Sequence, residues 1–174
     1  MKKLLLFIMG LLLPMLYINA QKALTTGDTV PAFVFHQVQQ THADLIILDF
    51  WASWCSSCLN CFPLLDSLQQ AFGGRLHIVL VNNLTATGEA SAHVDAFTQK
   101  YLSTHSSFRP RIMIDSSTRL RKLFPFIYLP HYVWIDSHRR IIAITGYKEI
   151  TYENIHALLN GERLSLPVKS DRYH

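Results

Sequence analysis

Three cysteines, the residues in this chain best suited to covalent chemistry, lie within seven positions of one another at Cys55, Cys58 and Cys61. Cys55 and Cys58 fall where a helix is expected to begin, so their side chains can meet across its first turn. Unpaired backbone N–H groups and the helix dipole favour a thiolate at the first sulfur. That thiolate could attack a substrate disulfide, and Cys58 could resolve the resulting mixed disulfide. The motif therefore predicts thiol–disulfide exchange.

Two other interpretations fit a cysteine pair at this spacing. Zinc and iron–sulfur sites use the same spacing, but each needs further ligands, and Cys61 is the only other cysteine in the chain. The pair could also be an inert structural bridge. Redox exchange is favoured over both, and no metal site is predicted.

A buried strand and an amphipathic helix flank the motif. Residues 45–50 (LIILDF) form an almost continuous apolar run, typical of a strand buried on both faces of a sheet. Apolar residues recur at helical spacing through 59–72, and two glycines then end the helix. The same patterns predict strands at 76–81, 111–114, 132–135 and 141–145, and helices at 89–101, 118–124 and 152–160.

The remaining segments are expected to be less regular. Residues 32–38 are interpreted as a strand or extended segment, 82–88 as a loop, and the polar tail after Gly161 as loosely held. The strands at 132–135 and 141–145 flank a turn and should form an antiparallel hairpin. Strand–helix–strand units followed by this hairpin predict an α/β sandwich with a mixed sheet.

The composition fits a single folded domain. The chain is 49% hydrophobic and 16% charged, which excludes a disordered chain. The net charge of +4 falls to +2 without the lysines at positions 2 and 3. The sequence has no basic block with interleaved aromatic residues, so no nucleic-acid partner is predicted.

The first twenty residues have the layout of a signal peptide. Two lysines precede an apolar run at 4–18, and Ala20 is a small residue suited to the position before cleavage. We therefore expect residues 1–20 to be removed, leaving an exported, periplasmic protein of residues 21–174. The alternative is an uncleaved N-terminus that anchors the protein in the membrane.

The segment from Asp49 to Cys58 (DFWASWCSSC) resembles the active-site motif of the thioredoxin superfamily. Pro63 matches the proline that kinks the active-site helix in that family, and residues 129–136 (LPHYVWID) resemble its second motif. Residues 27–33 (GDTVPAF) resemble the N-terminal extension of exported TlpA/ResA-type members. The resemblance covers about residues 25–161 and implies a thioredoxin-like three-layer sandwich with a mixed central sheet.

The resemblance also implies roles for individual residues. Cys55 would be the attacking thiolate, Cys58 the resolving thiol, and the two would form a redox-active disulfide. Asp49 matches the buried acid beneath the dithiol, where a low dielectric favours its neutral form and permits proton exchange. Trp54 would lie beside the nucleophile, and Trp51 would pack near the sulfurs.

The second motif implies a substrate-binding strand. Pro130 would be a cis-proline that turns the backbone beside Leu129 toward a substrate segment. His131 stands where a threonine is common in the family. It would either lie near the dithiol and tune the thiolate, or be an exposed residue at the start of a strand.

Three features depart from the family pattern. Ser56 and Ser57 replace the Gly-Pro of thioredoxins, and this dipeptide influences the reduction potential. Cys61 stands where ResA-like proteins commonly carry a glutamate, and it is interpreted as a buried filler rather than an alternative partner for Cys58. Residues 82–108 are longer than in a minimal thioredoxin, which predicts an insertion of the TlpA/ResA type.

The main functional hypothesis is an exported thiol–disulfide oxidoreductase, more often a reductase, that acts on protein disulfides or dithiols. It would need no cofactor, would receive electrons from a membrane-linked donor, and would be a monomer. The alternatives are a periplasmic chaperone that carries copper on Cys55, Cys58 and His131, a thiol peroxidase, and an interaction module without redox activity. The peroxidase is disfavoured because no proline lies at the required spacing before Cys55.

Overall fold

The computed structural model describes residues 22–38, 43–105 and 110–169, and the predicted signal peptide lies outside them. Within these residues the chain forms a five-stranded sheet in the order β3-β2-β1-β4-β5. The strands are β1 (Leu45–Phe50), β2 (Leu76–Asn83), β3 (Arg111–Asp115), β4 (His131–Asp136) and β5 (Ile141–Thr145). Strands β1, β2 and β3 are parallel, whereas β4 and β5 run antiparallel to their neighbours. The predicted mixed sheet and hairpin are confirmed.

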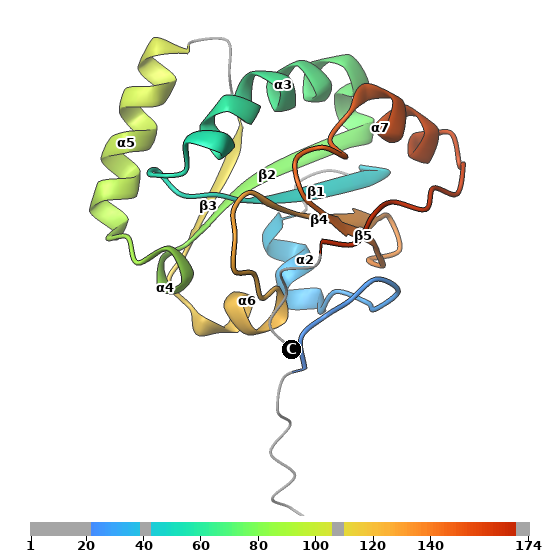
Figure 1. Cartoon of the computed structure of the whole chain (residues 1–174), viewed down its shortest axis with the longest axis horizontal. Helices are drawn as coiled ribbons and strands as arrows, with labels where there is room; N and C mark the ends of the chain where they lie inside the picture. Colours follow the sequence, from blue (N-terminus) through green and yellow to red (C-terminus); the bar gives the residue numbers. More distant parts are fainter. Residues whose placement is uncertain (1–21, 39–42, 106–109, 170–174) are drawn as a thin grey trace, which may run out of the picture.

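Helices cover both faces of this sheet (Figure 1). One face carries α3 (Ser56–Phe72), α5 (Ser91–Thr104) and α7 (Tyr152–Leu159), and the other carries α2 (Ala32–Val38) and α6 (Thr118–Leu123). Two apolar cores result, one between α3 and the sheet and one between α2, α6 and the sheet. The three-layer sandwich expected from the sequence is confirmed.

The central strand β1 fixes the position of the site. All six of its side chains are buried, and alternate residues serve the two cores. Leu45 and Ile47 face α3, whereas Ile46, Leu48 and Phe50 face α2 and α6. In the register of the sheet, Asp49 is opposite Leu80 of β2 and Tyr132 of β4. The chain leaves β1 at Phe50 and enters the cysteine motif directly.

Helix α3 begins at Ser56, three residues before the predicted start at residue 59. Cys55 is its N-cap residue, so the motif itself opens the helix. Pro63 lies inside the helix, as the resemblance implied. The helix ends at Phe72, and its C-cap residue Gly73 has a φ of 54°, which lies in the region that favours glycine. A short 3₁₀ turn, η2 (Gly73–Arg75), then leads into β2.

Three predictions about the irregular segments were wrong. Residues Ala32–Val38 form helix α2, because Val34, Phe35 and Val38 share a helical face that packs into the second core. The predicted loop at 82–88 contains the end of β2 and the short helix α4 (Leu84–Thr87), which Asn83 caps. The tail after Gly161 is irregular but held, since the Lys169 N–H donates to the Ile144 carbonyl at 3.0 Å.

The last helix follows its prediction. Thr151 accepts a hydrogen bond from the Asn154 N–H at 3.2 Å, as expected for the N-cap residue of α7. In the described ranges, every helix is too short or too polar to cross a bilayer.

Candidate active site

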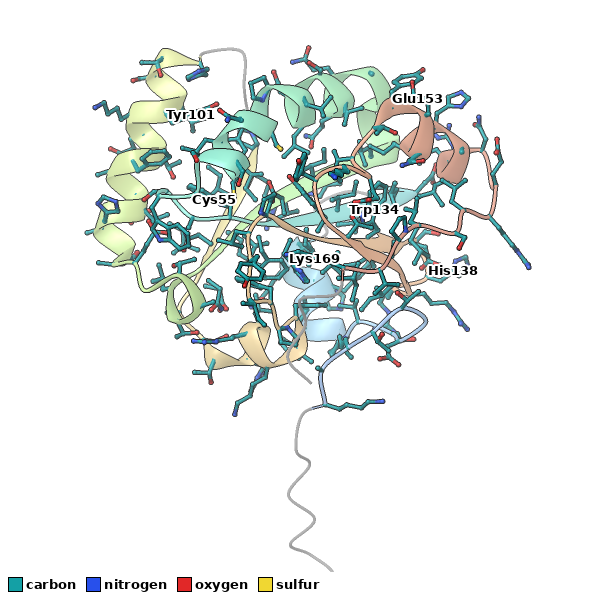
Figure 2. All side chains as sticks on the ribbon, viewed as in Figure 1. Cys55, Tyr101, Trp134, His138, Glu153 and Lys169 are labelled. Carbon is teal, nitrogen blue, oxygen red and sulfur yellow. A yellow bond between two sulfur atoms is a disulfide. The ribbon has the colours of Figure 1, made fainter. Side chains whose placement is uncertain are left out.

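The two cysteines of the motif are joined by a disulfide at the start of α3. The Cys55–Cys58 bond is 2.01 Å long and the two Cα atoms are 5.3 Å apart. Figure 2 shows Cys55 at the N-terminal end of α3, between this helix and the strands. The structure thus assembles the pair that the sequence predicted, and Cys61 lies outside the bridge.

The surroundings of the two sulfurs differ. The Cys55 sulfur accepts the Cys58 N–H at 3.2 Å and lies 3.4 Å from the Ser57 hydroxyl, which can also donate to it. Both contacts, together with the helix N-terminus, would stabilise negative charge on Cys55 after reduction. Cys55 keeps 6% of its surface exposed, whereas Cys58 is fully buried. Cys55 is therefore the sulfur that a substrate can reach.

Asp49 lies on the α3 face of β1, inside the core that contains the disulfide. It is fully buried, and neither of its carboxylate oxygens has a hydrogen-bond partner among the described residues. Burial raises the pKa of this carboxyl well above its ordinary value of 3.8. Its neutral form is therefore favoured over a wider pH range, and it can exchange a proton at higher pH than an exposed aspartate.

Cys61 and Tyr132 lie close to this carboxyl. The Cys61 thiol is half-buried against the Tyr132 hydroxyl, and both groups feel the charge of Asp49. Burial raises the pKa of the Cys61 thiol, the Tyr132 hydroxyl partly opposes this effect, and Asp49 adds to it. Burial likewise raises the pKa of the Tyr132 hydroxyl, and Asp49 again adds to the shift. These shifts keep both groups protonated and neutral at neutral pH.

The two tryptophans of the motif have different environments. Trp51 is buried and packs edge-on against Phe62, with ring centroids 5.4 Å apart. Trp54 is 63% exposed, and its indole N–H donates to the Thr87 carbonyl at 3.3 Å. Trp51 therefore anchors the motif in the core, and Trp54 presents an aromatic surface beside Cys55.

The second motif lies beside the dithiol. The Leu129–Pro130 peptide bond is cis, as the resemblance implied. Leu129 and Pro130 line a groove of about 480 Å³ together with Ser57 of the cysteine motif. The groove continues along residues 146–149 and 167–169. Ser57, two residues after Cys55, links this groove to the cysteine motif.

His131 occupies neither of the two places expected for it. It pairs with Phe50 in the sheet and is fully buried, so it is not an exposed residue at the start of a strand. Its ring packs against Phe50 and Phe126, with centroids 5.6 Å and 5.4 Å apart. Phe50 faces α2 and α6, so His131 lies on the face of the sheet away from α3 and the dithiol.

The copper set proposed from the sequence is therefore not assembled. His131 belongs to a different core from Cys55 and Cys58, and no group of three or more metal-ligating side chains occurs among the described residues.

Sequence reasoning missed two residues near the motif. Tyr132, rather than His131, is the β4 residue that faces Asp49, and only the register of β1 and β4 reveals this. The Glu89 side chain accepts hydrogen bonds from Ser53, which lies two residues before Cys55. Glu89 and Ser53 are 36 positions apart in the chain. The spacing of residues along the chain carries no signal for that contact.

Known proteins resemble this chain in sequence and in fold. The Thioredoxin family pattern matches residues 28–116, just over half of the chain. ResA, a thiol-disulfide oxidoreductase of Geobacillus thermodenitrificans, is 24% identical over an alignment of 153 positions, and the match covers 82% of this chain and 83% of that protein. The chain belongs to the thioredoxin superfamily, and its relatives of the ResA type extend along most of its length.

Other matches are shorter or concern the fold alone. The thioredoxin-like protein YneN of Bacillus subtilis is 31% identical over 64 residues, and the match covers 37% of each chain. The chain likewise spans only 35% to 41% of the length of the thioredoxins that it matches. The solved thioredoxin domain of a thiol-disulfide oxidoreductase from Bacteroides vulgatus has a TM-score of 0.59 and 17% identity, over 79% of this chain and 100% of that one.

The geometry and the relatives agree on the chemistry that the site can perform. A bridged Cys-x-x-Cys pair at a helix N-terminus, with one accessible sulfur and a buried carboxyl nearby, is suited to thiol–disulfide exchange. These features support the expected thioredoxin-like oxidoreductase.

Proposed function

We propose that this protein is an exported thiol–disulfide oxidoreductase that reduces disulfides in protein substrates. One observation carries the proposal: Cys55 caps α3, and its sulfur receives the Cys58 N–H and faces the Ser57 hydroxyl. This arrangement favours a reactive thiolate in the reduced protein.

The reaction proceeds in two exchanges. The Cys55 thiolate attacks one sulfur of the substrate disulfide, forms a mixed disulfide and releases the other substrate sulfur as a thiolate. Asp49, as a carboxylate, takes the proton of Cys58, and the Cys58 sulfur attacks Cys55. The second substrate sulfur leaves, and the substrate thiolates take up protons. The substrate gains two electrons, and the protein ends with the Cys55–Cys58 bridge.

The groove beside Pro130 is the proposed binding surface for an extended segment of the substrate. Tyr147 is exposed and lines this groove, and Leu129 adds an apolar wall. Two further exposed aromatic residues, Trp54 and Tyr128, precede Cys55 and Leu129 in the chain. Exposed aromatic side chains are common anchors in protein recognition. A protein substrate could therefore be held while Cys55 attacks its disulfide.

Export and electron supply complete the proposal. The sequence of residues 1–20 supports secretion, followed by cleavage after Ala20 or by anchoring through an uncleaved N-terminus. A membrane-linked dithiol donor would then regenerate the reduced protein, which would act as a monomer. Cell fractionation with N-terminal sequencing tests location and cleavage, and an intact residue 1 in the membrane fraction would favour the anchor.

Reduction of insulin disulfides with dithiothreitol as the electron source tests the proposed activity. The wild-type protein should accelerate insulin precipitation, and Cys55→Ser should reduce the rate to background. Equal rates for the two proteins would contradict the mechanism. A reduction potential near that of thioredoxin, about −270 mV, would support a reductase, and a value near −120 mV would support an oxidase instead.

A further inference from the structure

A second buried carboxylate, Glu89, lies beside the cysteine motif and has no part in the exchange described above. It is located between α4 and α5, and its side chain is only 4% exposed. A carboxylate is costly to bury unless hydrogen-bond donors surround it. The donors around Glu89 therefore indicate what this residue does.

These donors come from the cysteine motif and from β2. Both Glu89 carboxylate oxygens lie 3.2 Å from the Ser53 N–H, and the Ser53 hydroxyl donates to Oε1. The Asn82 side-chain amide donates to Oε2 at 2.8 Å. Glu89 thus connects the loop before Cys55 to the end of a central strand.

Neighbouring contacts hold the same loop. The Trp54 indole N–H donates to the Thr87 backbone carbonyl at 3.3 Å, and the Thr87 hydroxyl donates to the side-chain Oδ1 of Asn82 at the same distance. The Cys55 N–H donates to the Ala52 carbonyl at 3.0 Å, which closes a turn around Ser53 and Trp54. The two residues before Cys55 are therefore held both by this turn and by the segment 82–89.

His93 also meets this cluster, but the arrangement is not that of a hydrolytic triad. His93 Nε2 lies 3.1 Å from the Ser53 hydroxyl and 4.0 Å from Glu89 Oε1. In a triad the carboxylate would hold the other ring nitrogen and orient the imidazole behind the serine. Here Glu89 accepts hydrogen bonds directly from Ser53, and the His93 side chain is 65% exposed. The cluster therefore holds the backbone of the loop before Cys55 and does not form a catalytic triad.

We propose that Glu89 is a positioning residue for Cys55. By holding Ser53, it keeps Cys55 at the N-cap of α3, where the Cys58 N–H and the Ser57 hydroxyl meet the sulfur. The proposal rests on the proposed function, because it assigns Glu89 to the same exchange reaction. Its effect should fall on the reactivity of Cys55 rather than on the binding of substrate.

Glu89→Gln tests this role, with Glu153→Gln as the matched control. Glu153 is exposed on α7, and Figure 2 shows it well away from Cys55. The glutamine keeps the shape of the side chain but replaces one acceptor oxygen with an NH₂ group that faces other donors. We expect kcat for insulin reduction to fall about tenfold and KM to change less than twofold. Glu153→Gln should leave both constants unchanged.

The pH profile of Cys55 alkylation by iodoacetamide separates positioning from a simple charge effect. Loss of the cap contacts should move the midpoint of the Cys55 thiol to higher pH in Glu89→Gln. Removal of a nearby negative charge alone would move it to lower pH. A lowered or unchanged midpoint would therefore overturn the proposal, as would a fall in activity carried entirely by KM.

Ser53→Ala provides a second variant if Glu89→Gln does not fold. It removes the hydroxyl but keeps the Ser53 N–H on Glu89, so a fall of about threefold in kcat is expected, and no fall would count against the proposal. If the wild type is active and Glu89→Gln has the same activity as Glu153→Gln, only this inference is refuted. Undiminished activity in Cys55→Ser would instead refute the proposed function.

Discussion

Two buried carboxylates flank the same pair of cysteines, and they differ in what surrounds them. Asp49 in β1 is fully buried, and no described residue donates a hydrogen bond to its oxygens. The Glu89 side chain is 4% exposed, but it accepts hydrogen bonds from Ser53 and Asn82. Asp49 lies on the face of β1 that packs against the core containing the disulfide, and Glu89 binds the loop that leads into the disulfide.

The difference shows that burial alone does not define the role of an acid. A carboxyl without donors favours its neutral form and can exchange a proton when a nearby group changes charge. A carboxylate whose oxygens accept several hydrogen bonds instead holds its partners in place. We therefore propose proton transfer as the role of Asp49 and the positioning of Cys55 as the role of Glu89.

The largest effect is expected from Cys58→Ser, which removes the step that Asp49 is proposed to assist. Turnover of insulin should fall to background, and a mixed disulfide between Cys55 and the substrate should accumulate because nothing resolves it. Mass spectrometry of the trapped complex checks the linkage. Cys61→Ser should remain active and trap nothing. A complex linked through Cys61 would contradict the interpretation of this residue as a filler that takes no part in the exchange.

Asp49→Asn should slow the resolution of that mixed disulfide in the active protein. General acid–base assistance is typically worth 10² to 10⁴ in rate, so a fall of about 100-fold at pH 7 is expected. Stopped-flow measurement of the release of a labelled peptide from Cys55 reports this step directly. Resolution at the wild-type rate would remove Asp49 from the mechanism.

The stability of the oxidised protein should also depend on Asp49. Burial raises its pKa above 3.8, so the folded protein keeps a proton that the unfolded chain releases as the pH rises above this value. The contribution of Asp49 to stability is therefore greatest below pH 3.8, and it falls as the pH rises from 3.8 toward the pKa of the folded state. In Asp49→Asn the free energy of unfolding should decrease less steeply with pH, by up to about 1.4 kcal/mol per pH unit.

Urea denaturation at several values between pH 4 and pH 8 measures the free energy of unfolding of both proteins. The difference between the two slopes isolates Asp49 from the other titrating groups. Identical slopes would show that the carboxyl titrates alike in the folded and unfolded states.

The smallest effect is expected for the coupling between the two acids. Asp49 and Glu89 share no partner among the described contacts, so the losses in Asp49→Asn and Glu89→Gln should multiply in the double variant. An interaction free energy within about 0.5 kcal/mol of zero is expected from kcat/KM. A larger coupling would mean that the two carboxylates act as one unit.

The sequence predicted the parts of this comparison that depend on local patterns. The apolar run Leu45–Phe50 indicated a central strand, and the cysteine spacing indicated the bridge, because both follow from periodicity along the chain. The run Ala32–Val38 was assigned to the wrong element because a short apolar segment fits a strand or a helix equally well. Its packing against the second core decides the outcome.

The polar contacts of the site could not be predicted in the same way. Whether His131 or Tyr132 faces Asp49 depends on the register between β1 and β4, which the sequence pattern does not fix. Glu89 looks like any exposed glutamate before a helix until the fold brings Ser53 and Asn82 to it. Such contacts between distant residues follow from the tertiary structure alone.

The most direct test of the account is an NMR titration of the Asp49 carboxyl carbon, assigned by its loss in Asp49→Asn. The account predicts a midpoint well above the ordinary value of 3.8, because the buried carboxyl lacks donors among the described residues. A midpoint at or below 3.8 would show a stabilised carboxylate and would contradict the assignment of Asp49 as the group that moves the proton.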